Sequence, residues 1–321
     1  MNTFLKVILI IGLILTLSGA CIFVTAIAAS KWDLTVLSDT VTEYKTYTEP
    51  VGKETDTITL DFENADIILQ FSADDDTLTI QYPQLFDKNG NEKTEITLTH
   101  TDTGITICEK ALWYRNLISL WNFSTPQVVV TLPTERAYTL HIETNNGAIS
   151  VNGISGACNE ITLTTDNGKI STRDADLTCT RSLTLSTDNG KLELGKIHAQ
   201  QLFAETDNGN LLANGSLYAD RIEISSDNGS LVFNGDLSAD TLLAETDNGS
   251  ITISGILAAS DITLESNVGS IRAYLAGKRS DYSVRVEHDL GNTNITSQAG
   301  GEKNLSVQTD IGNIEISFTE E

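Results

Sequence analysis

The chain has 321 residues, of which 40% are hydrophobic, so it can bury a substantial core and is not a disordered protein. Its formal net charge of −24 argues against nucleic acid as a partner, because a polyanion would be repelled and no stripe of Lys or Arg could bind it. Only 4 Pro occur against 23 Gly, and abundant Thr, Ser, Asn and Asp are typical of short strands joined by tight turns.

Residues 7–29 form an apolar segment of 23 residues without a charge. A helix of that length rises about 34 Å, enough to cross a hydrocarbon core of roughly 30 Å. Ala26-Ile27-Ala28 resembles a cleavage site, so a removed signal peptide is the alternative. We expect residues 1–29 to be a retained single-pass signal anchor in the cell membrane. Lys6 keeps the N-terminus cytoplasmic, and the rest of the chain is extracytoplasmic.

The region after the anchor divides into a polar stalk over residues 30–50 and an irregular β cap over residues 51–136. Six short segments of the cap alternate apolar and polar residues, which indicates half-buried strands. They are residues 58–60, 67–69, 78–80, 96–98, 105–107 and 128–130. A stack of repeats needs an atypical end of this kind, because an exposed terminal repeat would leave strand edges and apolar core in solvent.

The cap contains an aromatic-rich stretch over residues 112–123 that holds two of the three Trp. Exposed aromatic side chains are typical of contact sites for a protein, a glycan or a membrane. The alternative is a hydrophobic lid folded over the first repeat. The candidate partner-binding residues are Trp113, Tyr114, Trp121 and Phe123.

Residues 137–321 repeat with a period of roughly 20 residues. Nine turn glycines are spaced 19 to 22 residues apart: Gly147, Gly168, Gly190, Gly209, Gly229, Gly249, Gly269, Gly291 and Gly312. The positions seven and five residues before each glycine are apolar in every repeat, and a second alternating pair usually follows two and four residues after it. The pattern predicts two strands per repeat. A further glycine often marks a second corner, at Gly153, Gly215, Gly235 and Gly255.

Two folds can use such a period. Asn-Gly between alternating strands also favours an antiparallel hairpin meander. Stacked repeats require the same side chain at the same position in every turn, and the register here is nearly constant. We therefore expect an all-β chain built on a parallel β-solenoid, or β-helix, capped by the irregular β region and preceded by one transmembrane helix.

Acidic residues recur two positions before the turn glycine, at Asp166, Asp188, Asp207, Asp227 and Asp247. Stacking would place them about 4.8 Å apart, an oxygen-rich edge that could hold Ca²⁺. The alternative is turn chemistry, because Asp bonds its own backbone while Asn and Gly accept a positive φ. We favour the turn and expect no cofactor, with these five aspartates as weak metal candidates.

Cys158 and Cys179 are 21 residues apart, which places them on neighbouring repeats, with Cys179 one residue out of phase. A disulfide is geometrically conceivable, and buried thiols are the favoured reading.

Three segments together resemble the bacterial putative-adhesin β-strand-repeat family, a domain of unknown function. They are Lys31-Trp32-Asp33 after the anchor, Val128-Val129-Val130-Thr131-Leu132-Pro133 closing the cap, and Thr309-Asp310-Ile311-Gly312-Asn313-Ile314 near the end. The resemblance implies a membrane-anchored β-repeat protein of Gram-positive bacteria. Some such proteins are encoded beside transcriptional regulators or in envelope-stress operons. The family defines no site.

We expect a non-enzymatic surface protein that presents its repeats for adhesion or for interaction with an unidentified cell-envelope partner. One alternative is an accessory or sensor of an envelope-stress response. Another is a carbohydrate-active enzyme, because several polysaccharide lyases are parallel β-helices with clustered acids. The acids here recur identically and His100, His141, His198 and His288 occupy unrelated positions, so no catalytic residue is predicted.

Overall fold

The computed structural model describes residues 40–50, 56–73, 77–101, 103–111, 125–134 and 136–320, with twelve residues between 12 and 29 that are helical. No helix among the described residues is both long enough and apolar enough to cross a membrane. Much of the predicted anchor over residues 7–29 lies outside the described residues.

The N-terminal part is a set of seven strands. They are β1 (Thr40–Pro50), β2 (Thr57–Phe62), β3 (Asp66–Ser72), β4 (Thr77–Asp87), β5 (Thr94–His100), β6 (Gly104–Ala111) and β7 (Gln127–Pro133). All six strands predicted in the cap are confirmed. Strand β1 pairs antiparallel with β4 along its whole length, so residues 40–50 belong to the sheet and not to the predicted polar stalk. Thr and Tyr residues, which favour strands, are frequent in this segment.

The repeats supply the remaining strands. They are β8 (Thr139–Thr144), β9 (Ile149–Thr165), β10 (Ile170–Thr187), β11 (Leu192–Leu194), β12 (Lys196–His198), β13 (Gln201–Thr206), β14 (Leu211–Ala213), β15 (Leu217–Tyr218), β16 (Arg221–Ser226), β17 (Leu231–Phe233), β18 (Leu237–Asn248), β19 (Ile251–Val268), β20 (Ile271–Leu275), β21 (Tyr282–Leu290), β22 (Lys303–Ile311) and β23 (Ile314–Phe318). A short 3₁₀ helix, η2 (Arg279–Asp281), precedes β21.

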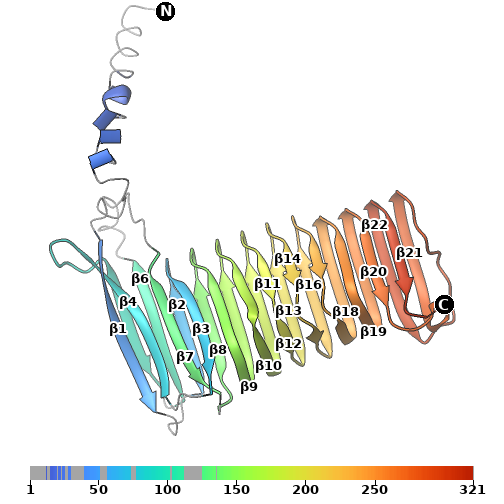
Figure 1. Cartoon of the computed structure of the whole chain (residues 1–321), viewed down its shortest axis with the longest axis horizontal. Coiled ribbons are helices and arrows are strands. Elements are labelled where there is room, and N and C mark those ends of the chain that lie inside the picture. Colours follow the sequence, from blue (N-terminus) through green and yellow to red (C-terminus); the bar gives the residue numbers. More distant parts are fainter. Residues whose placement is uncertain are drawn as a thin grey trace, which may run out of the picture.

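Every pairing between strands from β8 onward is parallel, so the antiparallel meander is excluded for this region. Leu202 lies beside Ile222, and Ile222 beside Leu242, so these central repeats pair with their neighbours at a 20-residue offset. We call one such repeat, with its turn glycine, a coil. The coils lie in a row that runs from the cap to β21 (Figure 1).

The central coils contain three strands rather than the two predicted. In the coil of Gly209, β13 precedes the turn, β14 follows it, and β15 completes the circuit. The third strand spans two residues, too short for an alternating pattern to reveal it. The predicted second corner is confirmed. It lies between β14 and β15, where a Cβ on Gly215 would come within 2.3 Å of the carbonyl carbon of Gly195.

The core runs through the middle of the stack. Of the paired apolar residues predicted before each turn glycine, all are buried except Val286, which is partly buried in β21. Aliphatic residues directly above one another exclude water along the axis, and each buried side chain contributes about 1.5–3 kcal/mol. A small residue recurs ten positions before the turn glycine, and it is buried at Cys158 and Ala259 and partly buried at Ala199, Ala219 and Ala239.

The turn glycines serve close packing rather than an unusual backbone conformation. Only Gly291 of the nine has a positive φ, at 144°. A Cβ on any of the nine would lie 1.7 to 2.0 Å from a carbonyl oxygen of the neighbouring coil. The prediction that these glycines adopt a positive φ is therefore wrong for eight of the nine. Glycine is needed at this position because stacking leaves no space for a side chain.

A hydroxyl side chain accompanies most of these glycines. Eight of the nine coils carry Thr or Ser three residues before the turn glycine, and each hydroxyl donates to the backbone carbonyl below it at 2.8 to 3.0 Å. The donors are Thr144, Thr165, Thr187, Thr206, Ser226, Thr246, Ser266 and Thr309. These hydroxyls satisfy carbonyl groups that the corner would otherwise bury.

The coils do not stack in chain order at the C-terminal end. Strand β22 pairs with β19 on one side and with β21 on the other. The last coil of the chain is therefore inserted between the two coils that precede it, and β21 forms the end of the row (Figure 1). His288 stands where the inner coils have Thr or Ser.

The same inversion occurs at the N-terminal end. Strands β2 and β3 pair with β8 and β9, while β6 and β7 lie on their outer side. Stacking thus extends into the region predicted as an irregular cap. Ala65 occupies the glycine position of this coil. Because Ala65 stands in place of the turn glycine, the glycine spacing in the sequence does not mark this coil as a repeat.

Candidate functional site

The Asn residues before the turn glycines form a ladder of side-chain hydrogen bonds, which we call the turn edge. Each Asn Nδ2 donates to the Asn Oδ1 of the neighbouring coil at 2.9 to 3.1 Å. The ladder joins Asn64, Asn146, Asn167, Asn189, Asn208, Asn228 and Asn248. The ladder ends at Asn248, because the next coils carry exposed Val268, Ile311 and Leu290 at this position. One residue earlier in the turn, Asn267 donates to Asp247.

The five predicted aspartates lie exposed along the same edge. Within the described part of the chain, no group of three or more His, Cys, Asp or Glu is arranged to hold a metal ion. The neighbouring Asn ladder bridges the coils beside these carboxylates. The five Asp side chains therefore lie exposed on an edge that amide groups hold together.

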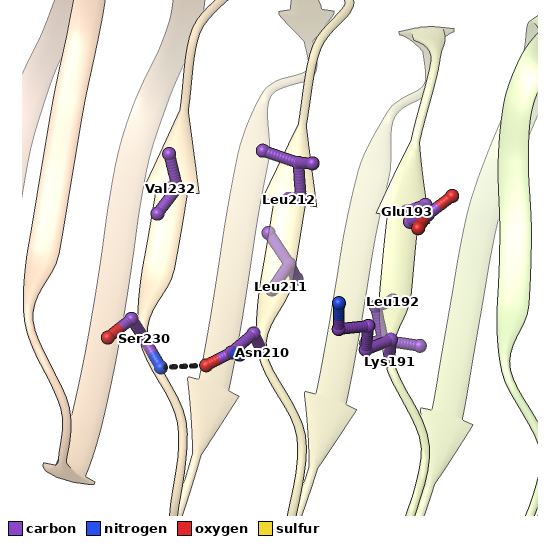
Figure 2. Close-up of a pocket in the computed structure, with 8 residues that line it drawn as sticks. All are labelled: Lys191, Leu192, Glu193, Asn210, Leu211, Leu212, Ser230 and Val232. Carbon is purple, nitrogen blue, oxygen red and sulfur yellow. Dashed lines mark hydrogen bonds between the residues drawn. The ribbon is translucent and has the colours of Figure 1, made fainter.

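A shallow hollow of about 270 Å³ lies on the strands that follow the turn, over β11, β14 and β17. Figure 2 shows its lining on three successive coils. Leu212 and Val232 are partly exposed at the outward position of β14 and β17, between buried neighbours. The same position is Ser150, Ser171 or Thr252 in other coils. We call this site the β14–β17 hollow.

The rim of the β14–β17 hollow is polar. Lys191, just before β11, and Glu193, on β11, border the hollow. Asn210 Oδ1 accepts a 2.8 Å hydrogen bond from the Ser230 N–H (Figure 2). Glu193 also pairs with Lys169 at 3.3 Å. Leu212 and Val232, with Lys191, Lys169 and Glu193 nearby, can bind a ligand that is partly apolar and partly polar.

Titratable groups with raised pKa values lie away from this hollow. Burial raises the pKa of Cys158 to about 11 and that of Cys179 to about 12, inside the core. Burial, helped by Glu49, raises the pKa of Tyr47 to about 12 in the cap. Burial also raises the pKa of Glu109, against the lowering effect of the Glu63 N–H, which donates to it at 3.0 Å. These shifts accompany buried structural roles.

A model of the Toastrack DUF4097 family matches residues 55–217. The chain belongs to this family. The match covers the predicted cap and the first coils, and it confirms the resemblance drawn from the repeat and strand motifs. Comparison with curated protein sequences gives no match.

Solved structures similar to this Toastrack chain are distant in sequence. A putative adhesin from Bacteroides fragilis is 16% identical, with 85% of this chain and 97% of that chain covered and a TM-score of 0.43. A putative lipid-binding protein from Parabacteroides distasonis is 13% identical, covering 87% and 97% with a TM-score of 0.39. A putative cell adhesion protein from Clostridium sporogenes is 14% identical, covering 86% and 100% with a TM-score of 0.23.

The structure brings together only part of what the sequence predicts for this Toastrack protein. The aromatic residues Trp113, Tyr114, Trp121 and Phe123 lie outside the described residues. Cys158 and Cys179 are paired in register on neighbouring coils, both buried and both free thiols. The phase difference of one residue between them is absorbed by irregular register on either side of the pair.

The β14–β17 hollow was missed by sequence reasoning. A signal for it exists, because Leu211-Leu212 and Leu231-Val232-Phe233 are continuous apolar runs where other coils alternate. Counting apolar residues at the position between the two buried ones would have located it.

Proposed function

We propose that this protein is a non-enzymatic binding protein of the cell envelope. Its stacked coils form a rigid β-solenoid outside the cytoplasm, and residues 1–29 anchor it in the membrane. The 23-residue uncharged segment supports the anchor. The observation that carries the binding role is the β14–β17 hollow, where Leu212 and Val232 place apolar side chains at the outward position that is Ser171 or Thr252 in nearby coils.

Rigidity favours such a role. Each coil is tied to its neighbour by parallel backbone pairing, by hydroxyl groups on buried carbonyls, and by the Asn ladder. Recognition by a surface that is already ordered avoids the entropic cost of ordering it on binding. A repeat stack of this kind presents one side chain per coil at a fixed spacing, which suits an extended partner such as a wall polymer.

The chemistry of the described surface supports binding over turnover. A hydrolytic site requires two acids, or a nucleophile and a base, converging on one cavity. The ionisable lining of the β14–β17 hollow is Lys191 and Glu193. The aromatic residues at 113, 114, 121 and 123 remain a second predicted contact site for the partner.

The proposal is tested by sedimenting the full-length protein with insoluble cell-wall fragments. We expect saturable binding that Leu212→Ser and Val232→Ser together weaken by about tenfold. Each substitution removes apolar contact area whose burial contributes up to about 2 kcal/mol to the binding free energy. Leu243→Ser is the matched control, because Leu243 is a partly buried outward leucine on the strand before the turn, away from the hollow. Equal binding by all three proteins would place the contact elsewhere, and absence of binding would contradict the proposal.

A further inference from the structure

A second hollow lies on another side of the stack, around the third strands. His198 ends β12 and Tyr218 ends β15, and the two residues are paired in register on neighbouring coils. Their rings stack with centroids 4.7 Å apart and planes 11° from parallel. The distance matches the spacing of adjacent strands, so the two ring planes lie roughly perpendicular to the axis of the stack.

The stack of rings stops at Tyr218. The next coil places Ser238 in register with it, and the coil after that has Ala258. His198 covers one face of the Tyr218 ring, whereas the other face borders a side chain with no ring. Tyr218 is 36% exposed, and it lines a hollow of about 350 Å³ together with Ser238. One ring position is therefore empty at the end of an aromatic ladder.

Two carboxylates stand beside this empty position. Asp220 and Asp240 line the same hollow on consecutive coils, and both are exposed. The floor is formed by the small residues Ala199, Ala219 and Ala239. The volume falls in the range of about 300–1,000 Å³ that is usual for ligand pockets.

These groups select the chemistry of a ligand. The face of an aromatic ring is electron-rich, so it attracts positively polarised C–H groups and cations. Carboxylates accept hydrogen bonds from O–H and N–H groups, most strongly from charged ones. A pyranose ring has both features, with C–H groups on its faces and hydroxyl or amino groups around its edge. An anionic sugar would be repelled by Asp220 and Asp240.

We infer that the hollow beside Tyr218 binds the pyranose rings of a glycan, with preference for amino sugars over neutral sugars and exclusion of uronic acids. The sugar stacks on the free face of Tyr218 above Ser238, and its hydroxyl or ammonium groups bond to Asp220 and Asp240. This inference rests on the proposed binding function and names a ligand class for it, at a site separate from the β14–β17 hollow.

The test is isothermal titration calorimetry of the full-length protein with three tetrasaccharides: glucosamine, N-acetylglucosamine and galacturonic acid. The wild type binds the glucosamine tetramer most tightly and the galacturonate tetramer not at all. Tyr218→Ser, which copies the residue of the next coil, weakens binding of the glucosamine tetramer by about tenfold, as expected for loss of a stacked ring. Tyr218→Phe retains the ring and binds within about twofold of wild type.

Two further variants make the result specific. Asp240→Asn reduces the preference for the glucosamine over the N-acetylglucosamine tetramer by about threefold, because a charge is lost while the hydrogen-bonding shape stays. Tyr274→Ser, at another exposed tyrosine, leaves binding unchanged. Unaltered affinity in folded Tyr218→Ser, an equal loss in Tyr274→Ser, or tight binding of galacturonate overturns the inference.

The outcome for wall fragments separates the two proposals. If the wild type sediments with wall fragments but binds none of the tetrasaccharides, the sugar site is wrong and the envelope function stands. If it binds the glucosamine tetramer but no wall fragment, the sugar site stands and the envelope function is contradicted.

Discussion

The hydroxyl of Thr187 donates a 2.9 Å hydrogen bond to the carbonyl oxygen of Gly168, one coil below it. A Cβ on Gly190 would lie 1.7 Å from that same oxygen. Thr and Gly three residues apart thus act on one carbonyl group, the first by bonding to it and the second by leaving room for it. The pair recurs through the stack and links the period of the sequence to the contact between coils.

Removing the hydroxyl should destabilise the stack. Thr187→Val keeps the shape of the side chain but leaves the Gly168 carbonyl without its bond, and we expect a loss of about 1–3 kcal/mol in the free energy of unfolding. Thr187→Ser is the control, because Ser226 and Ser266 serve the same position naturally. Urea denaturation of the full-length protein measures both. Equal stability of the Val variant and wild type would show that the bond is dispensable.

The glycine should be even less replaceable. Gly209→Ala forces a methyl group to within 1.8 Å of the Gly190 carbonyl oxygen, so two coils must separate locally, and we expect a loss above about 3 kcal/mol. Gly90→Ala is the contrast, because Gly90 has a φ of 83° in open space and its replacement costs about 1–2 kcal/mol of backbone strain. Thermal denaturation ranks the two. A milder effect at Gly209 than at Gly90 would refute the close-packing explanation.

The period, the core positions and the second corner follow from the sequence because each coil repeats one environment. Leu202 and Ile222 reveal their burial through alternation alone. The order of the end coils does not follow, because it is β22, and not β21, that pairs with β19, and this choice depends on contacts between segments of similar pattern. No local signal ranks those alternatives.

The candidate sites were less predictable. The Asp-Asn-Gly signature drew attention to Asp207, whereas Asn208 makes the contacts between coils. An exposed Asp and a bonded Asn look alike as turn residues, so propensity could not separate them. The aromatic ladder depends on His198 and Tyr218 sharing a register, which only the third strand establishes.

The turn edge should depend on its amides. Asn208→Ala removes one bond to Asn189 and one from Asn228, and we expect a loss of about 1 kcal/mol because both bonds are exposed. Asp207→Ala should leave stability unchanged or slightly raised, since like charges along the edge repel.

Calcium provides a separate check on the same edge. We expect the unfolding temperature to be the same in millimolar Ca²⁺ and in chelator, because the amides bridge the coils without a cation. A rise in Ca²⁺ that Asp207→Ala removes would reassign the edge as a metal site.

Alkaline pH should weaken the fold through the two buried thiols. Burial raises the pKa of Cys158 to about 11 and of Cys179 to about 12, whereas an unfolded thiol titrates near about 8.5. The unfolded chain therefore loses these protons first, so their contribution is complete below about pH 8 and declines as the pH rises.

Stability measured from about pH 8 to about pH 10 should fall more steeply in wild type than in the Cys158→Ala, Cys179→Ala double variant. The double variant loses core volume at every pH, so only the slope is diagnostic. Identical slopes would exclude the thiols as the source of the pH dependence of stability.

The inverted coil order predicts an internal role for the C-terminal segment. Ending the chain before Lys303 removes β22 and β23, and with them the strand on which β21 pairs. We expect rapid proteolysis within residues 276–302 of the truncated protein and exposure of the β19–β20 surface to a hydrophobic dye. If β21 were the inner coil, this truncation would leave residues 276–302 protected.

Binding and turnover on the cell wall can be followed in one measurement. Full-length protein is incubated with cell-wall fragments, and both the bound protein and any soluble sugar released are quantified. We expect saturable binding, reduced when Leu212 and Val232 are both changed to Ser, with no sugar released above the protein-free level. Release of sugar in proportion to protein, or the absence of saturable binding, would contradict the proposed non-enzymatic binding function.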